Sequence, residues 1–347
     1  MSTLATPTGD VPTSALPSWN DIEAAAARIE GLALRTPVMP GRGHLDELVG
    51  ATLFFKCENL QRVGAFKFRG AMNAVLQLDA DALARGVATH SSGNHAAAVA
   101  LAARLRGARA HVVMPEGSAA PKVEAVRGYG AEVTFCANTQ QAREEALAEI
   151  VARTGASFVH PYDDWRVVCG AATAAREFLD EVPDLDVLLT PVGGGGLASG
   201  SALTCKLRPG RHPAFVAVEP EAADDAARSL ATGVLQPQPA PRTIADGLRT
   251  ALSERTFAVL RTHADGIVTV SEAEIVAAMR LLMGRLNLVV EPSAAVPFAA
   301  LLAGRLPVAG KRVGIVLTGG NVDLDALPWA LPAQDAPTQL GPDSRRT

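Results

Sequence analysis

Short apolar segments with the length and composition of β-strands alternate with alanine-rich segments along most of the chain. The strand candidates are Thr52–Cys57, Val87–His90, Ala110–Met114, Ala131–Cys136, Ser157–His160, Val187–Val192, Ala214–Glu219, Ile267–Val270 and Arg312–Thr318. The segments with apolar residues at helical spacing are 20–29, 95–106, 119–128, 139–153, 171–181, 197–206, 272–286 and 293–303. Because strands that are apolar throughout are typical of parallel sheets covered by helices, this pattern predicts layers of parallel α/β structure.

The ordered part of the chain is expected to begin at Ser18, a predicted N-cap, and Ser271 with Glu274 forms a capping-box pattern at a later helix start. Residues 1–17 and 331–347 are rich in polar residues and proline without periodicity, which predicts two disordered tails. The prolines of 236–242 predict a loop. Because single cores stop growing at roughly 250–300 residues, a chain of 347 residues is expected to form two lobes.

Charge and composition narrow the class of partner. The net charge is −4 and the pI is about 6.0, with no long basic run, so nothing favours nucleic acid or a membrane surface, and a small molecule is the expected partner. Without a membrane-spanning run or a signal pattern, a cytoplasmic protein is expected. The cysteines show no Cys-x-x-Cys pair, which argues against a disulfide framework or a thiolate metal cluster and favours buried apolar positions: Cys57, Cys136, Cys169 and Cys205.

A single lysine lies between two aromatic residues in the run Gly-Ala-Phe-Lys-Phe-Arg-Gly, residues 64–70. If Lys67 is buried between Phe66 and Phe68, its amine loses hydration and its pKa falls, which suits a nucleophile that forms a Schiff base. The alternative is a surface lysine whose aliphatic stem covers the two rings.

Four consecutive glycines, residues 193–196, lie between a strand candidate and a helical segment. Backbone N–H groups without neighbouring Cβ atoms can close on a phosphate, and the helix N-terminus adds partial positive charge. The same run begins a Gly-x-Gly-x-x-Ala pattern that ends at Ala198, and Glu219 lies where this pattern expects an acidic residue that binds a ribose. That pattern would indicate a nicotinamide-dependent oxidoreductase, but it leaves Lys67 unexplained.

Two further loops follow strand candidates, where ligands bind in open α/β sheets. Residues 90–95, His-Ser-Ser-Gly-Asn-His, offer backbone N–H groups and short polar side chains to a carboxylate, or they form a serine N-cap. In Thr318–Asn321, the threonine hydroxyl could hydrogen-bond a ring nitrogen of a cofactor, or it could cap a turn.

In this order, the lysine run, Ser-Ser-Gly-Asn-His, Gly-Gly-Gly-Gly-Leu and Thr-Gly-Gly-Asn-Val-Asp resemble the motifs of the serine/threonine dehydratase and serine racemase family of fold-type II pyridoxal phosphate enzymes. The likeness covers about residues 20 to 327. It implies an α/β, tryptophan synthase beta-like fold, with two open parallel-sheet α/β domains and the cofactor between them. Residues 18–85 and 164–330 would form the large cofactor-binding domain and 86–163 the small substrate-closing domain. A homodimer is expected.

The resemblance also implies the roles of individual residues. Lys67 would form the Schiff base with pyridoxal 5′-phosphate and take the α-proton, and Ser92 would be a second catalytic residue on the opposite face of the cofactor. The other cofactor contacts would come from Phe66, Asn94, Gly193, Gly194, Gly195, Gly196 and Thr318. The substrate carboxylate would be bound by Ser91, Asn94, His95 and Arg143. Mg²⁺, Ca²⁺ or Mn²⁺ would be bound by Glu219, Asp225 and the carbonyl of Ala223, unless this acidic cluster is a solvated helix start.

The activity predicted by the resemblance is dehydration and deamination of L-serine or L-threonine to a 2-oxo acid and ammonia by a pyridoxal phosphate-dependent ammonia-lyase. Serine racemase and 3-hydroxyaspartate dehydratase are the alternatives within the family. Two departures affect this prediction: Ala65 replaces a serine that usually precedes Phe-Lys, and Gly-Ala-Ala-Thr at 170–173 replaces Gly-Gln-Gly-Thr. The lost hydroxyl and amide would alter polar contacts near the site, leaving substrate identity open and a catalytically inactive binding protein as a further alternative.

Overall fold

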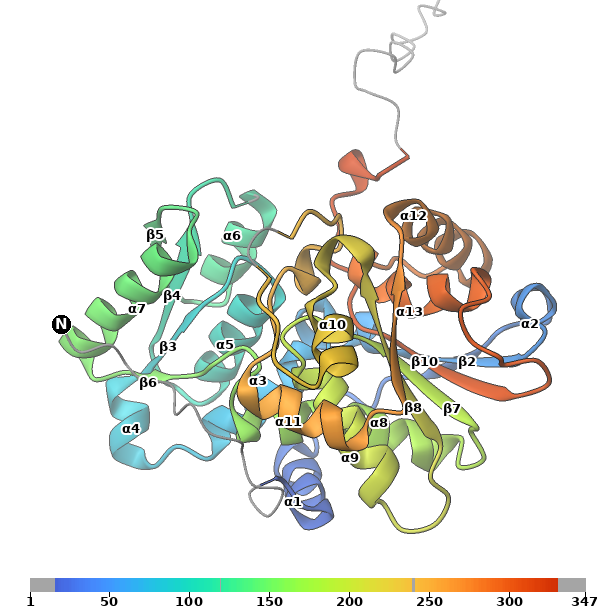
Figure 1. Cartoon of the computed structure of the whole chain (residues 1–347). Coiled ribbons are helices and arrows are strands. Elements are labelled where there is room, and N and C mark those ends of the chain that lie inside the picture. Colours follow the sequence, from blue (N-terminus) through green and yellow to red (C-terminus); the bar gives the residue numbers. More distant parts are fainter. Residues whose placement is uncertain (1–15, 119, 239–240, 330–347) are drawn as a thin grey trace, which may run out of the picture.

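The chain forms two sheets that lie side by side, each covered by helices (Figure 1). The structure is a computed structural model and describes residues 16–118, 120–238 and 241–329. The larger sheet has the order β1 (Val38–Pro40), β2 (Thr52–Cys57), β10 (Arg312–Leu317), β7 (Val187–Pro191), β8 (Ala214–Pro220) and β9 (Gly266–Val270). The smaller sheet has the order β5 (Glu132–Cys136), β4 (Ala110–Pro115), β3 (Val87–His90) and β6 (Ser157–Phe158).

The described helices connect these strands in an α/β alternation. Their bounds are α1 Trp19–Ile29, α2 His44–Val49, α3 Lys67–Leu76, α4 Ala80–Arg85, α5 Asn94–Leu105, α6 Ala120–Gly128, α7 Gln140–Thr154, α8 Trp165–Glu181, α9 Gly196–Leu207, α10 Asp225–Thr232, α11 Glu254–His263, α12 Glu272–Leu281 and α13 Pro292–Leu302. Among the pairs of described strands, only β1 with β2 is antiparallel. The parallel, two-sheet architecture predicted from the sequence is therefore confirmed.

Successive residues of the central strands face two different hydrophobic cores. Leu188 and Phe215 pack with α8, α9 and α11, whereas their neighbours Leu189 and Val216 pack with α12 and α13 on the other side of the larger sheet. Burial on both faces explains why most positions of these strands are apolar rather than alternate ones.

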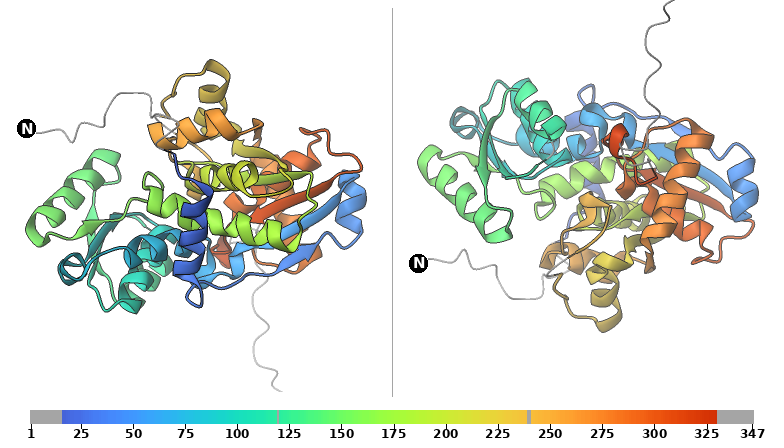
Figure 2. Two further views of the ribbon diagram at one scale, coloured as in Figure 1. Left: turned by 90° about the horizontal axis from the view of Figure 1, so that it is seen from below. Right: turned by 90° about the horizontal axis from the view of Figure 1, so that it is seen from above.

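Helices α3 and α8 lie at the junction of the two lobes, which we call the large lobe (six-stranded sheet) and the small lobe (four-stranded sheet). Phe68 and Met72 of α3 belong to the core of the small lobe, and Phe178 of α8 belongs to a core of the large lobe. The two helices pack directly against each other, and both views in Figure 2 show the lobes side by side. Lys67, the first residue of α3, is therefore placed between the lobes.

The predicted strands all form, with ends shifted by at most two residues, but the sequence prediction missed β1 and several helices. Strand β1 contains Pro40 and pairs antiparallel at the sheet edge, where proline is tolerated. The predicted helix 171–181 begins earlier, at Trp165, because Asp164 accepts a hydrogen bond from the main chain of Arg166 as its N-cap. The N-cap at Ser18 and the capping box at Ser271 are confirmed.

The strands of the smaller sheet all lie between residues 87 and 158, while the exact domain boundaries stay a prediction. The predicted tails lie outside the described residues, apart from Leu16 and Pro17. The described residues of the 236–242 loop contain no helix or strand.

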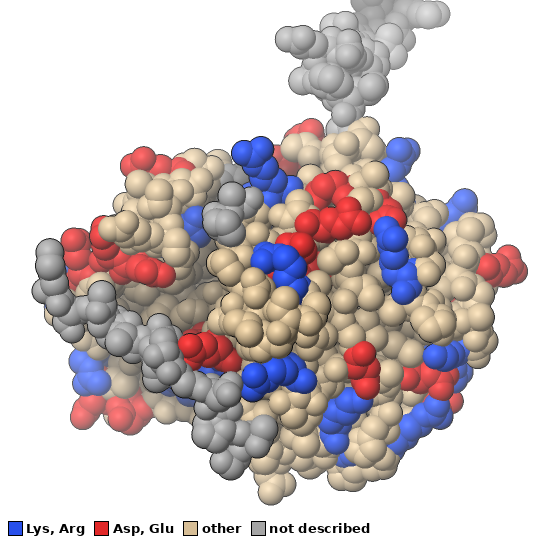
Figure 3. All heavy atoms as spheres, in the orientation of Figure 1, with Lys and Arg blue, Asp and Glu red and all other residues tan. Residues whose placement is uncertain are grey.

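Surface and membrane properties can be read from the described residues. No helix among them is long and apolar enough to cross a membrane. Acidic and basic side chains are interspersed on the face shown in Figure 3. All four cysteines are free thiols; Cys136 is partly exposed, and the others are buried as predicted.

Candidate active site

The carboxyl ends of the parallel strands bring the predicted loops together. In the larger sheet β10 lies between β2 and β7, and Leu317 at the end of β10 pairs with Cys57 at the end of β2. The segments that follow these strands, including Lys67, the glycine loop 193–196 and Thr318, consequently emerge at one edge of the sheet. This is the edge at which ligands bind in open parallel sheets.

The Lys67 amine is held at the lobe junction by the main chain of the small lobe. Its Nζ donates a hydrogen bond to the carbonyl oxygen of Pro161 at 2.9 Å and lies 5.2 Å from the centre of the Phe66 ring. Burial lowers the pKa of Lys67 to about 8, and the carboxyl of Glu291 opposes this shift. Phe66 alone flanks the amine, because Phe68 packs into the small-lobe core.

Main-chain bonds join the segment before Lys67 to the Thr318 loop. Phe66 donates its N–H to the carbonyl of Thr318 at 3.0 Å, and Ala65 forms an isolated antiparallel bridge with Gly319. Ala65 is fully buried. The Thr318 hydroxyl is also buried and has no hydrogen-bond partner among the described residues, so its bonding capacity is available to a ligand.

Asn94 is fixed by partners from the distant end of the chain. Its Nδ2 donates to both carboxyl oxygens of Glu291 at 3.0 Å, and its Oδ1 accepts a bond from Asn321 at 2.9 Å. Burial raises the pKa of Glu291 to about 7, with the Asn94 hydrogen bonds opposing the shift. The Ser91–His95 loop of the small lobe is thereby tied to the large lobe.

The glycine loop packs so closely that side chains would not fit. Gly195 has a φ of +87°, and a Cβ there would lie 2.7 Å from Leu252 and Thr256. A Cβ on Gly194 would overlap the ring of Tyr162. The loop ends at the first residue of α9, whose N-terminal N–H groups can receive an anion.

The other residues of the Ser91–His95 loop differ in what they can bind. Ser91 Oγ accepts a bond from the Gly93 N–H, and Ser92 is exposed. The His95 Nε2 must donate to the carbonyl of Val159, at 3.0 Å, since a carbonyl only accepts. Burial lowers the pKa of His95 well below its usual value, so its other ring nitrogen carries a lone pair and cannot donate to a carboxylate. Only the main-chain N–H of His95 remains for the predicted role.

Arg143 lies on α7, and its guanidinium donates to Asn138 at 3.0 Å. Its Nε is buried without a partner among the described residues. The structure does not bring Arg143 into hydrogen-bond contact with the Ser91–His95 loop, so its substrate role remains a prediction.

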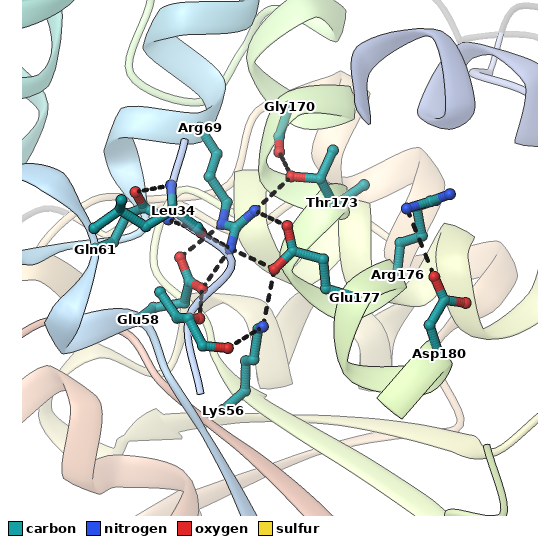
Figure 4. Close-up of polar contacts among 12 residues, drawn as sticks. Leu34, Lys56, Glu58, Gln61, Arg69, Gly170, Thr173, Arg176, Glu177 and Asp180 are labelled. Atoms are coloured by element: carbon teal, nitrogen blue, oxygen red, sulfur yellow. Dashed lines mark hydrogen bonds and ion pairs between the residues drawn. The ribbon is translucent and has the colours of Figure 1, made fainter. Parts of the chain in front are cut away.

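A buried ion network fixes the helix that begins at Lys67 (Figure 4). Arg69 is fully buried, bonds both oxygens of Glu58 and both oxygens of Glu177, and also donates to Thr173 on α8. Lys56 of β2 completes the charge balance through Glu177 at 2.9 Å. The network joins β2, α3 and α8 two residues from the reactive lysine.

The alanines that depart from the family pattern lie in this packing region. Ala171 and Ala172 are buried in a core of the large lobe, while their neighbour Gly170 contacts α3 so closely that a Cβ would lie 2.6 Å from the Arg69 carbonyl. Their packing gives these two substitutions a structural setting. The expectation that they alter the polar contacts available to substrate or cofactor stays a prediction.

The predicted metal ligands are buried carboxylates at the end of β8. Glu219 accepts the N–H groups of Ala226 and Ala227, and Asp225 accepts that of Leu252. Burial raises the pKa of Glu219 to about 9 and that of Asp225 to about 6. Among the described residues no three His, Cys, Asp or Glu side chains form a metal cluster, and the predicted set has two carboxylates with a carbonyl. It remains a proposal.

The sequence analysis gave no role to Glu291 or to the segment Pro161–Tyr162. The available signal in the sequence was that they lie in the short polar segments His-Pro-Tyr-Asp-Asp, residues 160–164, and Glu-Pro-Ser, residues 291–293. Their importance comes from long-range contacts with Asn94, Lys67 and the glycine loop.

These features fit pyridoxal phosphate. A lysine with a lowered pKa, a glycine cradle at a helix N-terminus and an unpartnered buried hydroxyl at Thr318 supply an amine, a phosphate site and a ring contact. In the dinucleotide interpretation Glu219 would bind a ribose, but its carboxylate already accepts the N–H groups of Ala226 and Ala227 at the start of α10.

Comparisons with known proteins agree with this site. The family model described as "Pyridoxal-phosphate dependent enzyme" matches residues 29–319. The chain is 49% identical to a β-hydroxyaspartate dehydratase from Paracoccus denitrificans (strain Pd 1222), covering 90% of this chain and 99% of that protein. It is 45% identical to a serine racemase from Arabidopsis thaliana, covering 88% and 93%. The solved structure of a serine racemase from Dictyostelium discoideum has a TM-score of 0.84 and 42% identity, covering 88% and 99%, and that of a threonine deaminase has a TM-score of 0.83 and 44% identity, covering 89% and 100%.

The family match spans most of the chain, and these relatives are aligned over nearly their full lengths. The chain belongs to the pyridoxal-phosphate dependent enzyme family, within the branch that contains hydroxy-amino-acid dehydratases and racemases.

Proposed function

We propose that this enzyme removes water and ammonia from a β-hydroxy-α-amino acid to give a 2-oxo acid. The observation that carries the proposal is the Lys67 amine, which is held by the carbonyl of Pro161 next to Tyr162, the residue that packs against the glycine loop. Its pKa of about 8 makes the neutral base accessible at physiological pH.

The reaction balances without an oxidant or a reductant. Lys67 takes the α-proton, the bond from the β-carbon to the hydroxyl breaks, and the hydroxyl leaves as water. The resulting enamine becomes an imine, and one water hydrolyses it to the 2-oxo acid and ammonia. Pyridoxal phosphate, when bound, supplies the electron sink that makes the α-proton removable.

The residues around Lys67 bind and orient the cofactor and the substrate. The glycine loop and the first N–H groups of α9 would hold the phosphate, the Thr318 hydroxyl would be available to the ring nitrogen, and Phe66 would flank the ring. A neutral hydroxyl at Thr318, unlike a carboxylate, would withdraw few electrons from the ring of the bound cofactor, which would favour prompt loss of the β-hydroxyl. The main-chain N–H groups at the start of α5 bind the α-carboxylate.

L-serine and L-threonine are the substrates expected from the sequence. The Paracoccus relative adds 3-hydroxyaspartate, which has the same reacting atoms and a second carboxylate. We propose all three as substrates of one elimination chemistry, in a cytoplasmic homodimer.

A racemase activity is the second candidate, supported by the Arabidopsis relative and by Ser92 next to Gly93 in the Ser91–His95 loop. Racemisation needs an acid or base on the face of the substrate that Lys67 does not reach. Ser92 is exposed in this structure, so it would have to turn toward the substrate.

The test is turnover of L-serine, L-threonine and 3-hydroxyaspartate by the holoenzyme, with 2-oxo acid and ammonia measured together. Borohydride should fix the cofactor on the peptide that contains Lys67, and Lys67→Ala should abolish both turnover and fixation. Fixation on Lys56 or Lys122 would contradict the assignment, and a holoenzyme that releases no 2-oxo acid from any of the three would contradict the function.

A further inference from the structure

Lys122 belongs to the small lobe and lies beside the Ser91–His95 loop. It lies in the first turn of α6, and its Nζ is 3.8 Å from the position that a Cβ on Gly93 would occupy. Gly93 lies between Ser92 and Asn94. The ammonium group is therefore adjacent to the loop to which the substrate α-carboxylate is assigned.

The partner of Lys122 comes from the large lobe. Its Nζ forms an ion pair with Asp246, the first residue of the short 3-10 helix Asp246–Leu248. The last residue of that helix, Leu248, packs against Gly193 of the glycine loop. The ion pair of Lys122 and Asp246 consequently lies between the Ser91–His95 loop and the glycine loop.

The electrostatics agree with this location. The carboxyl of Asp246 raises the pKa of Glu291 and the ammonium of Lys122 lowers it, so both charges act on the group that holds Asn94. The two charged side chains therefore lie within electrostatic reach of Glu291, the residue that holds Asn94.

The Asp246 carboxylate can be exchanged for another carboxylate. The side chains of Lys122 and Asp246 are 28% and 42% exposed, and ion pairs with this exposure are typically worth about 1 kcal/mol or less. A substrate whose other end is already anchored at Lys67 and α5 pays no further cost of association. Its second carboxylate would therefore compete effectively with Asp246.

We propose that Lys122 is the residue that selects hydroxy-amino acids with a second carboxylate, by binding that carboxylate in place of Asp246. The inference rests on the proposed function and names its substrate class: a four-carbon dicarboxylic hydroxy-amino acid such as 3-hydroxyaspartate is preferred to L-serine. Substrate binding then moves the Lys122 contact from the large lobe to the ligand.

The expected effect is large, because a hydrogen-bonded charge pair shielded by bound ligand contributes about 10- to 100-fold to binding. Lys122→Met should lower the ratio of kcat/KM for 3-hydroxyaspartate to kcat/KM for L-serine by at least about ten-fold. Lys122→Arg, which keeps a cation, should recover part of the ratio. Asp246→Asn should not reduce the ratio, because it removes only the competitor.

The chain offers a matched control. Lys206 and Asp265 form an ion pair with the same exposed fractions, 28% and 42%, on α9 and the segment before β9. Lys206→Met should leave the ratio unchanged. An equal fall of both kcat/KM values in Lys122→Met would overturn the proposal and make the pair a contact between the lobes without a part in selection.

A binding measurement separates this inference from the proposed function. L-aspartate and L-alanine lack the leaving hydroxyl but bind at the same groups, and their binding is followed by the absorbance of the cofactor. If Lys122→Met weakens the binding of L-aspartate by about ten-fold or more relative to the binding of L-alanine, the inference holds even where no elimination is detected. If the wild type eliminates water normally but Lys122→Met leaves this relative affinity unchanged, the inference fails and the proposed function stands.

Discussion

Removing the buried arginine next to the reactive lysine should cost far more stability than removing a surface arginine of the same type. Arg69 is fully buried and bonds four carboxyl oxygens, those of Glu58 and Glu177, at 2.7–2.8 Å. Arg69→Met fills much of the same volume but leaves Glu58, which is also fully buried, without its cation. The perturbation thus creates an uncompensated charge in the interior.

The magnitude follows from that burial. Breaking a buried ion pair by removing one partner typically costs about 3–5 kcal/mol, which corresponds to a fall in melting temperature of roughly 4–7 °C for a protein of 347 residues. Arg176 is the matched control, because it also makes a two-pronged contact with a glutamate, Glu23, but the two side chains are 26% and 39% exposed. Arg176→Met should cost about 1 kcal/mol or less.

The pH dependence gives an independent check. Although burial opposes its charge, the hydrogen bonds from Arg69 lower the pKa of Glu177 below its ordinary 4.5. A carboxyl with a lowered folded pKa stabilises the fold above its unfolded pKa, and this stability is lost as pH falls through the folded value. Arg69→Met should remove that part of the acid sensitivity.

The assay is urea unfolding of the holoenzyme followed by tryptophan fluorescence, together with thermal melting, for wild type, Arg69→Met and Arg176→Met. Adding Glu58→Gln to Arg69→Met should recover part of the loss, because it removes the stranded charge. A cost of Arg69→Met no greater than that of Arg176→Met, or no recovery in the double variant, would refute the reasoning.

Three further predictions concern the site. In apoprotein, attachment of pyridoxal phosphate to Lys67 should accelerate with pH around a midpoint near 8, and Glu291→Gln should move the midpoint lower because the carboxylate raises the lysine pKa; stopped-flow absorbance measures the rate, and an upward shift would contradict the contact. Chelator should lower the melting temperature of the wild type, and Mg²⁺, Ca²⁺ or Mn²⁺ should restore it, whereas the double variant Glu219→Gln/Asp225→Asn should respond to neither. If the melting temperature of the metal-free wild type does not change when these ions are added, the metal site is contradicted. Ser92→Ala should reduce any racemisation of L-serine by about 10²–10⁴ while sparing most dehydration; chiral chromatography separates the two, and equal losses would exclude a second catalytic face.

Strand positions were predictable from the sequence because burial on both sheet faces favours apolar residues at most positions of the strand. Val87–His90 and Thr52–Cys57 match the structure at both ends. Strand β1, by contrast, has three residues, one of them a proline, and owes its existence to pairing with β2. A segment that short carries no pattern of its own.

The same distinction holds within the site. Lys67, the glycine loop and Thr318 were recognisable because each is a short motif whose chemistry lies in neighbouring residues. The partners of Asn94 were not, since Glu291 lies 197 residues away in sequence and reaches it only through the fold. His95 shows the converse: the residue type suggests a carboxylate donor, but its bond to Val159 takes the one ring proton.

The reactive lysine is therefore positioned by contacts from both lobes. The Arg69 network fixes its helix to β2 and α8, while the Pro161 carbonyl of the small lobe receives its amine. Movement of the small lobe would change the second contact and leave the first intact, because α3 is anchored by buried charge pairs. The amine can then be released from Pro161 when a ligand occupies the site, without loss of its place on the helix. A lysine held in this way combines a fixed position with an exchangeable partner, which suits the proton transfer that we propose for Lys67.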